Sequence, residues 1–390
     1  MERVGILQDE LKQAGVFAAL IQKPRNLYYY AGTGQPCNLW VPAEGEPVLF
    51  TRRAHQLTES VTWINRICPA ITFQDMLNVL EKSGLVPTTG DRIAVELDSV
   101  PYRIIDRLQK DLGNVKLTNL SGIAMKQRLA KSPDEIEKIR EAGRLWALGH
   151  EAILQTARAG KTEYEVAAAM EYACRTNGGD AAVRFHRWDG CLPGGGIIAS
   201  GENGWVVSGH AMTVTGVGMD PSLPWGASER VLAQGDLFVA DYGVAKRSYH
   251  FDMARTYCIG KASDKQKELW QQLVDLHFRV IERVRAGVTG EELYQAALDT
   301  VKKMNLEPYF MGVGNDRGAY IGHSIGLEID EWPVLGPGAR EPLPVNAVIT
   351  VEPKFMIPGV GAVMVEDSIR VKTDGYELLG TVGHELPEIG

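Results

Sequence analysis

The hydrophobic and polar positions predict alternating helices and strands in the N-terminal part of the chain. Residues 1–20 mix apolar positions with charges as an amphipathic helix does, and short apolar runs follow at 16–21, 47–51 and 93–96. Apolar runs of this length are typical of strands. Alternation of helix and strand indicates an α/β domain. The tyrosine run at 28–30 is interpreted as strand packing.

A long amphipathic helix is predicted to follow this region. Ser132 precedes Pro133, and Glu135 stands three residues after Ser132, which is the pattern of a capping box with proline at the first helical position. Apolar and small residues then recur on one stripe, and the helix is expected to end near Gly160. We place a domain boundary just before this helix, which divides the chain into residues 1–125 and 126–390.

Beyond this helix the pattern predicts two more helices and several buried strands. The helices are expected at 162–177, where Thr162 and Glu165 repeat the capping box, and at 264–286. Short β-branched and aromatic runs at 237–241 and 348–352 each end in a carboxylate. Each is predicted to be a buried strand that carries an acid into the interior.

The composition of the chain indicates a folded globular protein and argues against a nucleic-acid-binding or membrane-spanning one. With 390 residues, of which 45% are hydrophobic and 23% charged, the chain is expected to fold into two globular domains. The net charge of -8 argues against nucleic acid as a partner, and the apolar runs are too short to span a membrane. The first twenty residues lack a signal peptide's apolar stretch, and the five scattered cysteines are typical of reduced thiols. We therefore expect a cytoplasmic protein.

Two aspartates form the first candidate site. Asp241 ends one predicted strand and Asp252 lies inside the next, so a hairpin would bring the two carboxylates together. His250 shares a face with Asp252 because side chains alternate along a strand. Two adjacent buried carboxylates need a shared proton or a cation. The pair alone fits either a metal site or a structural hydrogen-bonded pair.

One histidine and two more acids lie in similar settings further along the chain. His323 is flanked by glycines, and Glu352 and Glu366 are embedded in strand-like apolar runs where solvated acids are not expected. A histidine by itself is more often a satisfied structural residue than a ligand. Four carboxylates and one histidine, however, suit Mn, Fe, Co or Zn and suffice for two ions.

The Asp, Asp, His, Glu, Glu series, in this order and spacing, resembles the creatinase and aminopeptidase P superfamily, the M24 or pita-bread metallopeptidases. The resemblance covers nearly the whole chain. It implies an α/β (α+β) fold, with an N-terminal creatinase-like domain in residues 1–125 and a pita-bread catalytic domain in residues 126–390. The motifs that carry it are NLYYYAGTG, KSPDEIEKIREAG, GKTEYEVAAAMEY, IIASGENG, FDMART, GHSIGLE, VEP and VED.

The resemblance also implies roles for the five residues. Asp241 is expected to hold one divalent ion, Asp252 and Glu366 to bridge two ions, and His323 and Glu352 to complete the second. Glu352 is expected to act catalytically, by taking a proton from the attacking water and passing it to the leaving nitrogen. The implied reaction cleaves the peptide bond next to proline in a small peptide, by an enzyme that forms homodimers.

Asp330, His210 and Met364 depart from the family's pattern. Asp330 replaces a histidine that prolidase-like members usually carry after the ligand histidine. An aspartate there would repel developing negative charge, bind a cationic substrate group, or serve only as a salt-bridged acid of the loop. His210 is identified as the other active-site histidine, with catalytic and substrate-binding roles, although it lies later than usual. His250 could contact substrate or pair with a structural acid. Met364 stands where many members have arginine, and Arg255 is expected to hold a carboxylate.

Three functional hypotheses follow. The first is an Xaa-Pro dipeptidase or aminopeptidase-like metallohydrolase. The second keeps the fold and metals but acts on another C–N bond, or as a lyase, in a small zwitterion. Asp330 and the long segment after His210 favour it, whereas the presence of all five ligand residues argues against a metal-free mechanism of the creatinase kind. The third is a non-catalytic binding module, which the intact set of ligand residues disfavours.

Overall fold

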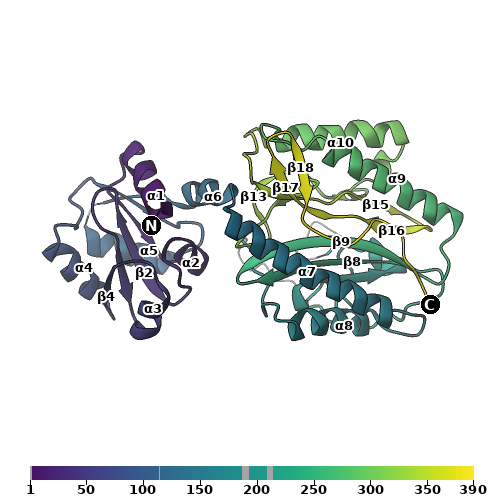
Figure 1. Ribbon diagram of the computed structural model, residues 1–390, viewed down its shortest axis with the longest axis horizontal. Coiled ribbons are helices and arrows are strands. Elements are labelled where there is room, and N and C mark those ends of the chain that lie inside the picture. The colour runs from purple at the N-terminus through teal and green to yellow at the C-terminus, as the bar shows by residue number, and fades with distance from the viewer. Residues whose placement is uncertain (1, 114, 187–192, 209–213) are drawn as a thin grey trace. The chain divides into compact units, whose positions relative to one another are not determined.

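The chain folds into two compact units, Met1–Arg128 and Leu129–Gly390 (Figure 1). The computed structural model describes residues 2–113, 115–186, 193–208 and 214–390. Each unit has its own buried hydrophobic cluster. Among the described residues, no helix combines the length and the apolar composition that crossing a bilayer requires.

The first unit is built on a mixed sheet with the strand order β4-β3-β2-β1-β5-β6. β1 pairs antiparallel with β2 and parallel with β5, and β5 pairs parallel with β6. The strands are β1 (Ala18–Ile21), β2 (Cys37–Pro42), β3 (Val48–Thr51), β4 (Arg66–Pro69), β5 (Arg92–Val95) and β6 (Lys116–Asn119). The helices are α1 (Glu2–Gln13), α2 (Pro24–Ala31), α3 (His55–Val61), α4 (Phe73–Lys82), α5 (Tyr102–Leu112) and α6 (Ser121–Leu129). The α/β organisation predicted for this region is confirmed.

The tyrosine run at 28–30 lies in helix α2, so the prediction of strand packing there was wrong. Pro24 stands at the helix start, and Gly32 ends the helix in the left-handed conformation, where its N–H donates to the Tyr28 carbonyl. This start signal and this stop signal bound a short helix in which Tyr29 and Tyr30 are buried. Local aromatic content favours a strand, but the flanking proline and glycine decide otherwise.

Four helices of the second unit begin at capping boxes. They are α7 (Pro133–Thr156), α8 (Glu163–Thr176), α9 (Asp264–Ile281) and α10 (Gly290–Met304). The capping boxes predicted at Ser132 and Thr162 are confirmed. Helix α9 ends at Ile281, before the predicted residue 286, and the N–H groups of Arg283 and Val284 donate to carbonyls three residues back, which forms a turn in place of another helical turn.

Two larger sheets and two separate hairpins complete the described part of the second unit. The strand orders of the larger sheets are β19-β9-β8-β7 and β13-β12-β14-β17-β18, and the hairpins are β10-β11 and β15-β16. Helices α7 and α8 lie along β8 and β9, whereas α9 and α10 lie beside the strands at the other side of this unit (Figure 1). The strands are β7 (Gly196–Ser200), β8 (Leu237–Lys246), β9 (Tyr249–Ile259), β10 (Gly312–Val313), β11 (Asp316–Arg317), β12 (His323–Ser324), β13 (Glu331–Val334), β14 (Val348–Val351), β15 (Lys354–Ile357), β16 (Gly361–Met364), β17 (Asp367–Lys372), β18 (Gly375–Leu378) and β19 (Glu388–Ile389).

The predicted hairpin between the two aspartates is confirmed as β8 and β9. Its turn places Arg247 and Ser248 at positive φ, which suits the tight turns of hairpins. In the register, Asp241 lies opposite Ala254 and Asp252 lies opposite Gly243. Asp241 and Asp252 are therefore diagonal neighbours on one face of the sheet.

Candidate metal centre

The five predicted ligand residues come from separate strands or strand ends of the second unit. Asp241 lies on β8, Asp252 on β9 and His323 on β12, while Glu352 directly follows β14 and Glu366 directly precedes β17. All except the half-buried Asp241 are buried. Buried carboxylates are rare unless they are paired or bind a cation.

Hydrogen bonds between β9 and the start of β17 bring the acids of the two sheets together. The Asp252 N–H donates to Ser368 Oγ at 3.1 Å, and the Ser368 hydroxyl donates to the Asp252 carbonyl at 2.7 Å. The Glu366 N–H donates to the Ala254 carbonyl at 3.1 Å. These bonds hold Glu366 beside the strand that carries Asp252.

Three of the five side chains converge closely. Asp252, His323 and Glu366 each offer one possible ligand atom, and these atoms lie within 4.8 Å of one another. His323 Nε2 lies 3.9 Å from Asp252 Oδ2 and 3.6 Å from Glu352 Oε1. Such separations are too long for hydrogen bonds. They are close to the spacing of atoms that share one ion at about 2.0–2.2 Å.

The electrostatics of these acids favour a bound cation. Burial, and then the charges of Asp241 and Glu352, raise the pKa of Asp252 well above its usual range. Burial, and then the charges of Asp252 and Asp241, raise the pKa of Glu366 in the same way. Both shifts mean that the ionised carboxylates repel one another in a dry environment. Divalent cations would remove this repulsion, so the residues fit a metal centre.

Lys354 is a charged residue of this cluster that the sequence analysis missed. Its Nζ lies 3.2 Å from Glu352 Oε2, and both side chains are buried. The available signal was a lysine inside the apolar run that follows the VEP motif. A buried cation beside candidate metal ligands is unusual, because it repels the metal ions that the acids would bind.

His250 has backbone partners on both ring nitrogens. The Arg184 N–H donates to Nε2 at 3.0 Å, so Nδ1 carries the proton and donates to the Gly326 carbonyl, also at 3.0 Å. Burial lowers the pKa of this imidazole, which agrees with a neutral ring. Both ring nitrogens of His250 therefore already form hydrogen bonds with the backbone, one with the segment around residue 184 and one with the segment around residue 326. The contact between His250 and substrate stays a prediction.

Asp330 lies in a small polar cluster with His186, a residue that the sequence analysis did not single out. The His186 N–H donates to Asp330 Oδ1 at 2.7 Å, and its ring Nδ1 lies 3.4 Å from Glu328 Oε2. The charge of Asp330 contributes to the raised pKa of Asp252. Asp330 therefore acts electrostatically on Asp252, one of the candidate metal ligands.

His210 lies outside the described residues. The segment that precedes it is held by Glu163, which is fully buried at the start of α8. Its carboxylate accepts hydrogen bonds from Ser200, Asn203 and Ser228, with donor–acceptor distances of 2.6 to 3.0 Å. This network gives a physical reason for the serine and asparagine of the IIASGENG motif.

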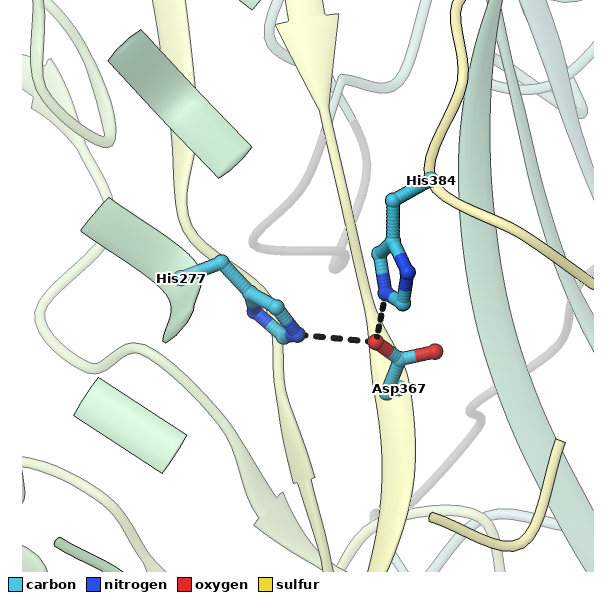
Figure 2. A group of neighbouring side chains, drawn as sticks. All are labelled: His277, Asp367 and His384. Carbon is cyan, nitrogen blue, oxygen red and sulfur yellow. Dashed lines mark hydrogen bonds and ion pairs between the residues drawn. The ribbon is translucent and has the colours of Figure 1, made fainter. Parts of the chain in front are cut away.

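A second polar network is centred on Asp367, the residue that follows Glu366 in the chain, and includes His277 and His384 (Figure 2). Asp367 Oδ2 accepts hydrogen bonds from His277 Nε2 at 2.8 Å and His384 Nε2 at 2.7 Å, and its Oδ1 accepts one from Arg255 Nη2 at 2.8 Å. Burial acts to raise the pKa of Asp367, but Arg255 and the two histidines outweigh it, and the pKa lies well below its usual range. The prediction that Arg255 holds a carboxylate is confirmed.

This network also contacts the backbone of Glu366, a candidate metal ligand. Arg255 Nη1 donates to the Glu366 carbonyl at 2.7 Å, and Arg255 Nη2 donates to the Val382 carbonyl at 2.9 Å. The nitrogen–oxygen distances around Asp367 are those of hydrogen bonds. We therefore interpret His277, Asp367 and His384 as a positioning network for Glu366.

Comparison with known proteins agrees with this geometry. Residues 137–373, more than half of the chain, match the model of metallopeptidase family M24, and residues 3–130 match the creatinase/prolidase N-terminal domain. The Xaa-Pro dipeptidase of Pyrococcus furiosus is 27% identical over 387 residues, with 99% of each chain covered. An uncharacterized peptidase of Bacillus subtilis, YqhT, is 28% identical over 80% of each chain.

Solved structures show the same architecture over the full length. The Xaa-Pro dipeptidase from Bacillus anthracis has a TM-score of 0.84 at 26% identity and covers 100% of this chain and 99% of its own. The X-Pro aminopeptidase from Thermotoga maritima has a TM-score of 0.80 at 25% identity, with 98% of each chain covered. The predicted mixed fold, with a creatinase-like domain followed by a pita-bread domain, is confirmed. As the sequence motifs predicted, the chain belongs to metallopeptidase family M24.

Proposed function

We propose that this protein is a metal-dependent Xaa-Pro peptidase, a dipeptidase or an aminopeptidase P-like enzyme. The observation that carries the proposal is the buried cluster of Asp252, His323, Glu352 and Glu366, which joins acids of two sheets around one histidine. Full-length relatives named Xaa-Pro dipeptidase and X-Pro aminopeptidase support the choice of substrate. The cytoplasmic location and the homodimer stay predictions.

We assign two divalent ions, Mn, Co, Zn or Fe, to this site. Asp241, Asp252, His323, Glu352 and Glu366 are the residues that would hold them. Carboxylates and imidazole are suitable ligands for all four metals, so the metal that fills the site depends on availability. Divalent ions here would polarise the scissile carbonyl and make a water molecule more acidic.

Glu352 is the proposed proton carrier. One of its oxygens faces His323 and the other faces Lys354, so the carboxylate is held in a defined orientation. It would accept a proton from the attacking water and deliver it to the leaving nitrogen. His210 is proposed as the second active-site histidine on the basis of the family resemblance.

Turnover of a small peptide panel tests the proposed function. The purified protein is stripped of metal, reloaded with Mn, Co or Zn in separate samples, and given Xaa-Pro dipeptides and Xaa-Pro-Yaa tripeptides. Metal-dependent release of proline, or of the N-terminal residue, is expected, and Asp252→Asn should abolish it. Absence of cleavage in protein shown to bind metal would contradict the peptidase assignment.

A second function is favoured by one observation, the acidic residue Asp330 beside the metal ligands. A negative charge there suits a substrate with a cationic group, such as a small zwitterion with another hydrolysable C–N bond, or one cleaved by a lyase. In that case the metal-loaded protein would leave the peptide panel intact and convert small amides or cyclic amidines.

A further inference from the structure

A cavity of about 180 Å³, partly open to solvent, lies between helix α8 and strand β8. Apolar side chains form much of its wall, among them Met170, Val183 and Val244. Two polar side chains, Glu171 of α8 and Tyr242 of β8, line it as well. Because a cavity of roughly 150 Å³ can hold benzene, this one is large enough for a small organic molecule.

The cavity is separate from the candidate metal centre. Tyr242 follows Asp241 on β8, and successive side chains of a strand point to opposite faces of the sheet. The described residues that line the cavity include none of the five candidate metal ligands. A molecule in the cavity would therefore lie behind the strand that carries Asp241, on the face turned toward the helices.

The Tyr242 hydroxyl is a polar group that the protein leaves unmatched. The side chain is 2% exposed, and its hydroxyl has no hydrogen-bond partner in the described part of the chain. Such a group has lost its contacts with water and gained nothing in exchange, which is rare in native structures. Apart from burial, the charge of Glu171 contributes most to the raised pKa of this tyrosine, so the two groups lie near each other.

The Glu171 carboxylate brings a negative charge to the same cavity. It is half-buried, and burial alone raises its pKa, with no donor or cation to offset the effect. Arg175 lies one helical turn further on, at the usual spacing of an ion pair, but no ion pair joins the two in the described ranges. Gly194 passes directly over the carboxylate, and a Cβ atom there would collide with it. The glycine thus keeps room beside the acid.

We propose that this cavity binds a small organic ammonium ion, whose nitrogen is held by the Glu171 carboxylate and the Tyr242 hydroxyl and whose carbon atoms contact the apolar wall. An ammonium group has the opposite charge and three donors, enough for both oxygens. Glu171 would repel an anion, and a neutral alcohol would leave its charge unbalanced. Simple amines and free amino acids share the ammonium group, and Arg175 at the cavity edge would suit the carboxylate of an amino acid. The site is independent of the proposed peptidase function.

Calorimetry of the metal-loaded protein tests this proposal, with n-propylammonium as the probe and 1-propanol as a neutral molecule of the same size. We expect wild type to bind the ammonium more tightly than the alcohol. Glu171→Gln should weaken this binding by roughly tenfold to hundredfold, as for the loss of one charged hydrogen bond, and Tyr242→Phe by roughly twofold to tenfold. Glu151→Gln, at an exposed position of α7, is the matched control and should bind like wild type.

Two further measurements identify the ligand and exclude the metal centre. If alanine or proline binds more tightly than n-propylammonium and loses this advantage in Arg175→Gln, the site takes amino acids; otherwise it takes simple amines. The affinity for n-propylammonium should be equal in metal-loaded and metal-free protein, because the cavity lies on the other face of β8.

Three results would overturn the proposal. The first is wild type that does not bind n-propylammonium, or binds it no more tightly than 1-propanol. The second is binding that both Glu171→Gln and Tyr242→Phe leave unchanged. The third is binding that disappears with the metal, since the ammonium would then occupy the metal centre. Melting temperatures are measured alongside, and Tyr242→Phe, which removes one hydroxyl only, decides the matter if Glu171→Gln does not fold.

Discussion

Glu352 shows how much of the proposed chemistry rests on one side chain. Its two carboxylate oxygens face different partners, His323 on one side and Lys354 on the other. The acid is buried, directly after a strand that is itself buried. A residue held from both sides cannot easily turn away from the site, and this suits a group that must accept and release a proton at fixed positions.

Glu352→Gln should reduce turnover by roughly 10²- to 10⁴-fold, because the amide cannot carry the proton while it keeps the size of the side chain. Steady-state kinetics with the best peptide of the panel would measure this. Metal content should be measured in the same samples, to separate lost proton transfer from lost metal. Glu341→Gln, at an exposed position, is the matched control and should keep wild-type turnover. Turnover within threefold of wild type in Glu352→Gln would rule out the proton-carrier role.

His150 predicts a pH dependence of stability. Its ring stacks on Trp146, Nδ1 lies 2.7 Å from the Tyr257 hydroxyl, and burial lowers its pKa. A lowered pKa means that the folded state favours the neutral ring. Its contribution to stability is therefore complete above the unfolded pKa of about 6.5 and is lost as the pH falls from there toward the lower folded value.

On a change from pH 7.5 to pH 5.5, the Tm of wild type should consequently fall further, relative to its own value at pH 7.5, than the Tm of His150→Gln. The difference between the two proteins is the quantity that reports on His150, because the lowered pKa values of His250 and His277 act in the same direction and the raised pKa values of Asp252 and Glu366 in the opposite one. Thermal unfolding followed by circular dichroism at both pH values checks this. An equal decrease in wild type and His150→Gln would contradict it.

At the scale of elements, close contact between neighbouring strands sets the position of Asp241. Gly196 on β7 lies opposite Tyr242 on β8. A Cβ atom on Gly196 would come within 2.4 Å of the Asp241 carbonyl oxygen and 2.3 Å of Tyr242 Cγ. No side chain fits there without moving β8, so the glycine lets the strand that carries a proposed metal ligand approach its neighbour.

Gly196→Ala should displace β8 and reduce both metal affinity and stability, the latter by about 1–3 kcal/mol, as is usual for overpacking. Titration of the metal-free variant with Mn or Zn would measure the affinity, and urea denaturation the stability. Gly5→Ala in α1 is the control: its Cβ meets nothing within 4 Å, so stability should stay the same or rise slightly. Unchanged metal affinity in Gly196→Ala would show that β8 tolerates the shift.

At the scale of the whole molecule, metal binding and folding of the second unit should be linked. The acids at the site repel one another when ionised, as the raised pKa values of Asp252 and Glu366 show. They come from strands of two different sheets. A cation that binds the folded site therefore holds these sheets together, and the unfolded chain offers no comparable site.

Removal of metal by a chelator should lower the Tm, and added divalent metal should restore it. At a free metal concentration of about 1,000 times Kd, the expected gain is about 4 kcal/mol. Scanning calorimetry of metal-free and reloaded protein would measure the shift, and Asp252→Asn should gain much less. A Tm that does not respond to Mn, Co, Zn or Fe would contradict a metal centre at this place.

Local sequence determined the features that depend on neighbours along the chain. Capping boxes at Ser132 and Thr162 need only residues three apart, and the β8–β9 hairpin needs only two apolar runs and a polar turn, so both were predictable. The ordered series of acids and one histidine was enough to predict the family. The prediction of strand packing for Tyr28–Tyr30 was wrong because it followed the aromatic content of the run and not the flanking proline and glycine, which bound a helix.

Tertiary structure alone decided which polar groups meet. Glu163 accepts hydrogen bonds from Ser200, Asn203 and Ser228, and Asp367 pairs with His277 and His384, although these partners are 17 to 90 residues apart in the chain. In the sequence, Lys354 is only a lysine within an apolar run. The structure shows that its side chain is buried and that its ammonium lies beside the Glu352 carboxylate. Residue type and spacing determine which chemistry a side chain is capable of. Its burial and its partners from distant parts of the chain determine its electrostatic environment, and only the tertiary structure sets these.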